Sequence, residues 1–376
     1  MRLSDRIQSI EESGTVQFTS LIQRLSEEGK EIINFAVGEP YEETPRAVIE
    51  STKDALDAQK TRYGPVAGLP ELKARLALQF EGYDENHIIL SNGSKQSLYS
   101  IFQIICNPSD EVIIPKPYWV SFSQQVKLAG ANPVFVDTLN HQLDCNGIEQ
   151  AITKRTRAIV INTPNNPTGA VYPRKDLEKI ARLAGERDLF VISDEAYGFF
   201  VYDGLENISL FAFENIREKA IIIRSFSKSY SMTGFRIGYV AASKNIIKEL
   251  SKIQSHLTGN VCTFAQYGAL AALAIDKNTL FRRRSELQRK RDIAYDYASK
   301  LFKCIKPHGA FYLFPDVSDH LQRGENAEDF AARLLNHSGV AVVPGEVFGI
   351  SKHVRISYAL PEDILLKGFE RITGAL

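Results

Sequence analysis

Short apolar runs alternate with longer stretches of helical periodicity from about residue 87 onward. Apolar runs bounded by turn residues are typical of buried strands, and amphipathic stretches between them are typical of helices. The alternation therefore predicts an α/β fold in which a mostly parallel, seven-stranded sheet is covered by helices on both faces. The predicted strands are 87–91, 111–114, 133–136, 157–162, 188–193, 219–224 and 237–241, and helical patterns lie around 95–106, 119–129, 173–187 and 244–257.

The pattern changes near the C-terminus, where short apolar runs are mixed with helical stretches after a long helical region that ends near residue 304. Such a mixture predicts a smaller α+β domain, and we expect the N-terminal arm to return to it. The short runs are 311–314, 340–343 and 353–358. The predicted domains are a large one over 41–280 and a small one over 1–40 and 281–376.

Composition excludes several classes of protein. The chain has 376 residues, and its 45 basic residues balance its 45 acidic ones, so no net field attracts nucleic acid or an anionic membrane. Its four cysteines and seven histidines are dispersed, which predicts neither disulfides nor a metal site. No apolar run approaches the roughly 20 residues of a membrane span, and the N-terminus lacks the apolar core of a signal peptide. We therefore expect a cytoplasmic protein.

The strongest candidate chemistry lies in the stretch Ser225–Gly238, which begins where a predicted strand ends. Ligands in open α/β sheets bind at the carboxyl ends of strands. Lys228 could form an imine with an aldehyde, and pyridoxal 5'-phosphate is the cofactor aldehyde most often held in this way. Ser225 and Arg236 could hold its phosphate, the arginine through its planar fork of donors. On this stretch alone, a surface loop with a solvated lysine remains an alternative.

Two further stretches suit a phosphate and a ring. Gly93, Ser94 and Lys95 open a helix after the first predicted strand of the sheet, and the positive end of a helix suits a phosphate. A Gly-Ser helix start is also common without any ligand. Trp119 follows the next strand and could stack on a pyridine ring, although a single tryptophan more often packs in a core.

Two more stretches suit the polar edge of that ring. Asn166 lies in a loop that two prolines and a glycine constrain, so its amide could donate to the phenolate oxygen of the ring. Asp194 follows a buried strand and needs a partner, because an isolated buried carboxylate is costly. A protonated pyridine nitrogen would be that partner and would keep the ring an electron sink. Tyr197 is placed to donate to the same ring oxygen.

Taken together, the motifs Asn166-Pro-Thr-Gly169, Ser193-Asp-Glu-Ala-Tyr197 and Ser225-Phe-Ser-Lys228 resemble those of a class I aminotransferase of the pyridoxal-phosphate fold-type I superfamily. The resemblance covers essentially the whole chain and is closest to aspartate/aromatic-type aminotransferases. It implies that Lys228 holds the cofactor as an imine and that Asp194, Tyr197 and Lys228 are catalytic. The cofactor-binding residues that it implies are Tyr63, Gly93, Ser94, Lys95, Trp119, Asn166, Asp194, Tyr197, Ser225, Lys228 and Arg236.

The resemblance also implies a substrate site and a partner subunit. Arg355 matches the family's arginine for the α-carboxylate, and Gly38 matches a glycine that lies against the substrate, beside Trp119 and Asn166. Tyr63 resembles a tyrosine that reaches the phosphate of the neighbouring subunit, which implies a homodimer with active sites at its interface.

The implied reaction moves the amino group of an L-amino acid to a 2-oxo acid, with 2-oxoglutarate the usual acceptor, by ping-pong kinetics. Two alternatives stay open: a carbon–sulfur β-lyase on the same fold, and a ligand-sensing module without catalysis. The donor is also open, because a dicarboxylate needs a second cation and the arm segment 13–18 is neutral.

Overall fold

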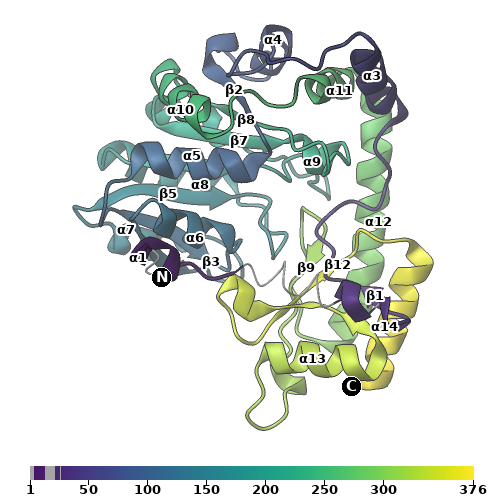
Figure 1. The fold of residues 1–376 in the computed structure, drawn as a ribbon. Helices are drawn as coiled ribbons and strands as arrows, with labels where there is room; N and C mark the ends of the chain where they lie inside the picture. Colours follow the sequence, from purple (N-terminus) through teal and green to yellow (C-terminus); the bar gives the residue numbers. More distant parts are fainter. Residues whose placement is uncertain (1–3, 13–21, 26) are drawn as a thin grey trace.

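The computed structural model describes residues 4–12, 22–25 and 27–376. All seven predicted strands of the large sheet are present, within a few residues of the predicted bounds. They are β2 (Ile88–Ser91), β3 (Glu111–Lys116), β4 (Asn132–Asp137), β5 (Thr156–Asn162), β6 (Phe190–Asp194), β7 (Ala220–Ser225) and β8 (Gly238–Ala241). Their order is β2-β8-β7-β6-β5-β3-β4 (Figure 1). Strands β3 to β7 are parallel, whereas β8 is antiparallel to both of its neighbours, so the predicted mostly parallel α/β sheet is confirmed.

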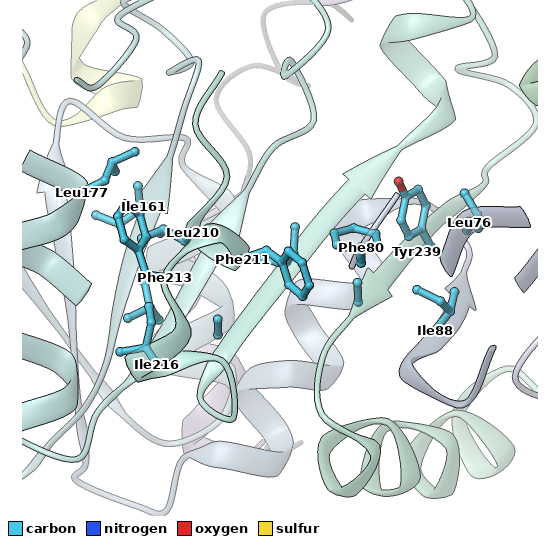
Figure 2. Close-up of a cluster of buried hydrophobic side chains, with 14 of the residues drawn as sticks. Leu76, Phe80, Ile88, Ile161, Leu177, Leu210, Phe211, Phe213, Ile216 and Tyr239 are labelled. Atoms are coloured by element: carbon cyan, nitrogen blue, oxygen red, sulfur yellow. The ribbon is translucent and has the colours of Figure 1, made fainter. Parts of the chain in front are cut away.

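Two apolar cores lie on opposite faces of the large sheet, because successive side chains of a strand point to opposite faces. On β5, Ile159 and Ile161 belong to one core (Figure 2), and Ala158 and Val160 belong to the other. The first core includes side chains of α3 (Arg46–Asp57), α4 (Pro70–Ala77), α8 (Arg174–Glu186) and α11 (Thr263–Leu273). The second includes α5 (Ser94–Ile105), α6 (Ser121–Leu128) and α10 (Lys244–Leu257).

One helix longer than a single turn in the large sheet region was not predicted. It is α7 (Cys145–Ala151), and the side chain of Asp144 caps it by accepting hydrogen bonds from the backbone N–H groups of Asn146 and Gly147. Asparagine and glycine are poor helix formers, so the helical pattern is weak and the cap is the main local signal.

The small domain contains a three-stranded sheet in the order β11-β12-β9, made of β9 (Tyr312–Leu313), β11 (Val343–Pro344) and β12 (Val354–Ser357). Strand β1 (Ile33–Asn34) pairs in parallel with β10 (Val340–Ala341). The chain therefore returns its N-terminal part to this domain. Helices α13 (Ala327–Ser338) and α14 (Glu362–Ala375) complete it. The predicted domain bounds stay a prediction, and α12 (Lys277–Leu301) runs through the bound at residue 280 (Figure 1).

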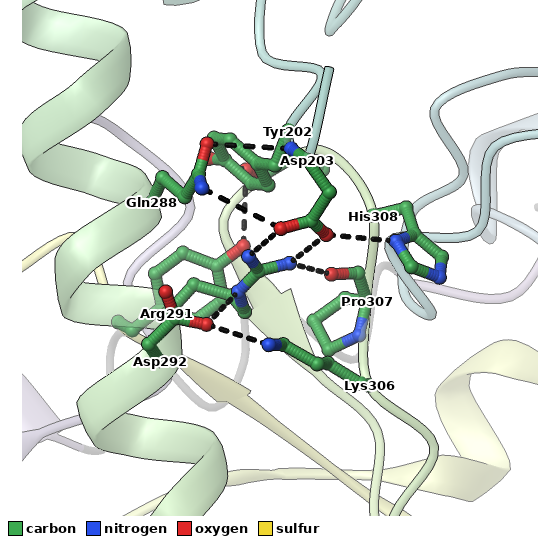
Figure 3. A network of polar contacts seen from close by, with 10 residues as sticks. Tyr202, Asp203, Gln288, Arg291, Asp292, Lys306, Pro307 and His308 are labelled. Carbon is green, nitrogen blue, oxygen red and sulfur yellow. Dashed lines mark hydrogen bonds and ion pairs between the residues drawn. The ribbon is translucent and has the colours of Figure 1, made fainter. Parts of the chain in front are cut away.

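A polar network joins α12 to the loop that contains Asp203 and to the loop that precedes β9 (Figure 3). The fully buried guanidinium of Arg291 donates to both carboxylate oxygens of Asp203, at 2.7 and 2.9 Å, and to the carbonyl oxygen of Pro307 at 2.6 Å. The backbone N–H of Gly309 donates to the carbonyl oxygen of Gly169 at 2.9 Å. These contacts fix the chain that leads into β9 against the loop that carries Asn166.

In the described part of the chain, no helix is long and apolar enough to cross a membrane. The same residues contain no group of three or more His, Cys, Asp or Glu side chains placed to hold a metal ion. The described arm includes α1 (Asp5–Gln8). The neutral segment 13–18, expected near the substrate side chain, lies outside the described residues.

Candidate active site

A cavity of about 260 Å³ opens at the carboxyl ends of the central strands, where the large domain faces the small one. Large-domain loops after β2, β3, β5, β6 and β7 reach it, as expected for an open α/β sheet. The small domain and the segment after β1 close the other side. The lining residues are Ala36, Gly38, Ser94, Trp119, Asn162, Asn166, Asp194, Ala196, Tyr197, Lys228, Tyr312 and Arg355. Eight of the predicted site residues are therefore brought together: Gly38, Ser94, Trp119, Asn166, Asp194, Tyr197, Lys228 and Arg355.

Lys228 is presented to the cavity by α9 (Phe226–Ser229), a single turn that begins directly after β7. The hydroxyl of Ser225 caps this turn by accepting a hydrogen bond from the backbone N–H of Ser227 at 3.1 Å. The lysine Nζ donates to the carbonyl oxygen of Gly38 at 2.5 Å. Burial lowers the pKa of Lys228 to about 8; Glu39 opposes the shift, and the charges of Arg355, Arg236 and Lys95 add to it. A larger share of this amine is thus neutral near pH 7 than in an exposed lysine.

Asp194 ends β6, and only 3% of its surface is exposed. Its Oδ1 accepts a hydrogen bond from the backbone N–H of Ala196 at 3.1 Å. Burial, with a smaller contribution from the neighbouring Glu195, raises the pKa of this carboxyl to about 6 against the lowering effect of the Ala196 hydrogen bond, and no cation among the described residues contributes to the shift. A buried carboxylate in this position favours a cationic partner from the cavity.

The adjacent Glu195, in contrast to Asp194, has a cationic partner within the protein. Its side chain is fully buried, but it forms an ion pair with Arg224 at 2.9 Å and accepts hydrogen bonds from the hydroxyls of Ser193 and Ser209. Its charge is thus satisfied within the protein. Of the two neighbouring carboxylates, Asp194 is the one left to serve a ligand.

Arg355 projects from β12 and meets the large domain. Its Nη1 donates to Oδ1 of Asn166 at 3.0 Å, and its Nη2 donates to the carbonyl oxygen of Ala36 at 3.0 Å. A guanidinium has five N–H donors, so these two bonds orient it and leave others for a carboxylate. The backbone of Asn166 is held in turn, because its N–H donates to the side chain of Asn162 at 2.9 Å.

The phosphate end of the predicted site is built at the start of α5. Gly93 precedes the helix with φ +81°, and a Cβ atom added there would lie 2.5 Å from Nη2 of Arg236. Only glycine lets that guanidinium approach the helix start. Arg236 itself has φ +55°, and its Nη1 donates to the carbonyl oxygen of Thr233 at 2.8 Å. A positive side chain beside free helical N–H groups is suited to an anion.

The remaining predicted residues do not line the cavity. Lys95 places its Nζ 5.2 Å from the ring centroid of Trp119, which does line it. Ser225 caps α9, as described above. Tyr63 is 99% exposed on the surface of the single chain. Two residues without a predicted role, Asn162 and Tyr312, also line the cavity and hydrogen-bond to predicted residues.

This arrangement fits pyridoxal 5'-phosphate. A buried carboxylate without a cation suits a protonated ring nitrogen, Trp119 offers a face for the ring, and the Gly93–Arg236 contact suits a phosphate. The fold and the site together define a pyridoxal-phosphate-dependent transferase.

The chain belongs to the family "Aminotransferase class I and II", whose sequence model matches residues 30–372. It is 38% identical to the aspartate aminotransferase of Bacillus sp. (strain YM-2), with 98% of each chain covered. It is 40% identical to the probable aspartate/prephenate aminotransferase of Aquifex aeolicus, with 100% of this chain and 98% of the relative covered. The solved structure of the Thermus thermophilus aspartate aminotransferase with maleate superimposes with a TM-score of 0.95, at 38% identity and with full coverage of both chains.

These findings confirm the predicted family, fold and class of enzyme. The protein is an aminotransferase (EC 2.6.1.-), and enzymes of this class use pyridoxal 5'-phosphate.

Proposed function

We propose that this aminotransferase transfers the amino group of L-aspartate to 2-oxoglutarate, by ping-pong kinetics. The names of the relatives support an acidic donor and support transfer over the β-lyase alternative. The observation that carries the choice of a dicarboxylate is the number of cations around Lys228. Three of them lower its pKa, namely Arg355, Arg236 and Lys95.

Two of these cations are already assigned to groups other than the substrate side chain. Arg355 binds the α-carboxylate, and Arg236 binds the cofactor phosphate. Lys95 is then the cation for the second carboxylate of the substrate. Its accessible side chain lies beside Trp119, and its pKa is lowered by burial of part of the side chain and by the charge of Arg236. This assignment departs from the sequence-based prediction, which placed Lys95 on the phosphate.

The bound cofactor supplies the carbonyl group that receives the amino group and a ring that draws electrons from the substrate. Arg355 holds the α-carboxylate and so fixes the Cα–H bond relative to Lys228. The Nζ of Lys228 would remove the proton from Cα of the substrate and deliver it to the former carbonyl carbon of the cofactor, two atoms away. This amine donates to the carbonyl oxygen of Gly38, which holds it at the cavity. Asp194 would hold a protonated ring nitrogen through its charge, and Tyr197 and Asn166 would donate hydrogen bonds to the ring oxygen. The first product leaves before the second substrate binds, which gives ping-pong kinetics.

A donor screen tests the proposal directly. With 2-oxoglutarate as acceptor, L-aspartate is expected to give the highest kcat/KM among the common L-amino acids, measured as formation of glutamate. The same donors incubated without any 2-oxo acid are the control. Release of pyruvate and ammonia in that control would support the lyase alternative instead.

Replacing Lys95 with methionine tests the second cation, because methionine keeps an apolar stem against Trp119 and removes the charge. A charge-assisted contact is lost, so KM for L-aspartate is expected to rise about 10- to 100-fold. The KM for L-phenylalanine and the affinity for the cofactor are expected to change by less than about 3-fold, since neither would use this charge. Equal losses for both substrates, together with weaker cofactor binding, would return Lys95 to the phosphate.

We also propose that the enzyme is a homodimer in which Tyr63 serves the site of the other subunit. The support is its exposure of 99%, because a large aromatic side chain on a Gly- and Pro-rich loop is seldom left fully in water. The cytoplasmic location, expected from the scattered cysteines, stays a prediction.

A heterodimer of one Lys228→Ala chain and one Tyr63→Ala chain tests the crossing. If Tyr63 crosses the interface, one of the two sites regains both native residues, and the heterodimer is expected to be more active than either variant homodimer. The Tyr63→Ala homodimer itself is expected to lose about 10-fold in kcat/KM, the effect of one hydrogen bond to a charged group. A heterodimer no more active than that homodimer would place Tyr63 in its own subunit's site.

A further inference from the structure

Tyr312 contacts two of the predicted site residues, although no sequence motif marked it. It is the first residue of β9, it is completely buried as a residue, and it lines the cavity. Its hydroxyl oxygen lies 2.9 Å from that of Tyr197, and its ring centroid lies 4.3 Å from the guanidinium carbon of Arg355. One side chain thus connects a residue for the cofactor with a residue for the substrate.

The two hydroxyls can share only one hydrogen bond in one direction at a time, because each phenol carries a single proton. In the proposed function, Tyr197 donates its proton to the ring oxygen of the cofactor. It can then only accept from Tyr312, so Tyr312 is the donor across the 2.9 Å contact. The resulting chain runs from Tyr312 to Tyr197 to the ligand, and such chains polarise each member. This step rests on the proposed function.

The ring of Tyr312 acts on Arg355. It covers one face of the guanidinium, and Phe348 lies at 5.2 Å as a second aromatic neighbour. Hydrogen bonds to Asn166 and to the carbonyl oxygen of Ala36 fix two of its nitrogens, and its Nε has no hydrogen-bond partner among the described residues. The aromatic face therefore restricts the one direction that these bonds leave free.

The backbone holds Tyr312 firmly enough for this role. In the small sheet it is paired with Ser357, two residues after Arg355 on β12. The preceding Ala310 has φ +55°, and its N–H donates to the carbonyl oxygen of Phe200 at 2.9 Å. The loop before β9 is thus tied to the large domain, as Figure 3 shows for Pro307 and His308.

We propose that Tyr312 is a positioning residue for amino transfer. Its hydroxyl directs the proton of Tyr197 toward the cofactor's ring oxygen, and its ring orients Arg355 for the α-carboxylate. The two actions belong to different parts of one side chain, so they can be separated by substitution.

The test uses the cofactor-loaded Tyr312→Phe and Tyr312→Leu variants, with Tyr358→Phe as the matched control. Tyr358 is equally buried in the small domain, and its hydroxyl donates to the carbonyl oxygen of Ala310 at 3.2 Å, outside the cavity lining. The main readout is the pH at which the visible absorbance of the bound cofactor changes by half. That midpoint reports the proton held between the ring oxygen and the nitrogen of Lys228.

Tyr312→Phe removes only the hydroxyl, so Tyr197 becomes a weaker donor and the ring oxygen a less stable anion. The midpoint is expected to rise by about 0.3 to 1 pH unit, and kcat to fall about 3- to 10-fold, with KM for the amino acid changed by less than about 2-fold. Tyr312→Leu also removes the ring, so KM is expected to rise by a further factor of about 3 to 30. Tyr358→Phe is expected to leave the midpoint and both constants unchanged.

An unmoved midpoint in Tyr312→Phe, or the same shift in Tyr358→Phe, would overturn the proposal, whatever the Tyr312→Leu variant does. The spectral midpoint is measured without any substrate. If the donor screen identified a donor other than L-aspartate, the proposed function would be overturned, but the spectral midpoint would still test the role of Tyr312.

Discussion

Replacing Lys228 with alanine is expected to lower kcat by at least about 10⁴-fold, because one change removes both the covalent attachment and the base that moves the Cα proton. The neighbouring contacts are independent of this side chain. Asp194, Trp119 and Arg236 are therefore expected to keep the cofactor bound without a covalent bond. Single-turnover absorbance changes of the bound cofactor, on mixing with L-aspartate, measure the loss.

A small amine in solution serves as the control for Lys228→Ala. If the missing group is the base, methylamine is expected to restore part of the rate in proportion to its concentration of free base. Full activity of the variant without added amine would refute the role of Lys228. Failure to bind the cofactor would instead show that the covalent bond is needed for retention.

Replacing Asp194 with asparagine is expected to lower kcat about 10²- to 10⁴-fold, the range for loss of a group that sets a proton in place during catalysis. Asparagine has nearly the same shape and can still accept a hydrogen bond from the N–H of Ala196, but it carries no charge to hold a cationic ring nitrogen. Proton removal from Cα then becomes limiting. A primary isotope effect with Cα-deuterated L-aspartate, larger than that of the wild type, is the measurement that checks this.

Glu195→Gln is the matched control for Asp194→Asn, because it neutralises the next residue of the same buried strand end. Its partner Arg224 would be left without a counter-ion, so this variant is expected to lose about 3–5 kcal/mol of unfolding free energy. Its kcat per folded molecule is expected to stay within about 3-fold of wild type, since Glu195 does not line the cavity. Equal kcat losses in both variants would contradict a special role for Asp194.

The large sheet could be predicted because its strands are short runs such as Ile221-Ile-Ile223, buried on both faces and bounded by turn residues. The site followed from the same reasoning, since polar residues placed just after buried strands meet at one edge of a parallel sheet. Asp194, Asn166 and Lys228 were predicted in this way, and all three line the cavity. Arg355 depended on the family resemblance, because an arginine within a strand carries no such positional signal.

The features that were missed depend on contacts between distant parts of the chain. Tyr312 lies in the apolar run Phe311–Phe314, where it has the pattern of an ordinary core residue, and only the fold brings its hydroxyl to Tyr197. The position of Lys95 beside Trp119 depends likewise on how α5 approaches the loop after β3. Helix α7 was missed because its cap, and not its periodicity, defines it.

The placement of charges along the cavity has a consequence for the steady-state abundance of the protein in the cell. A desolvated acid at one end lacks a counter-ion, while Lys228 is pushed toward neutrality by burial and by three positive neighbours. A bound molecule with a cationic group beside Asp194 and an anionic group beside the positive side chains would offset both unfavourable charges. Any ligand that binds the native state more tightly than the unfolded state shifts the folding equilibrium toward the native state. Scarcity of vitamin B6 would accordingly reduce not only turnover but also the steady-state abundance of the polypeptide, by exposing more of it to proteolysis.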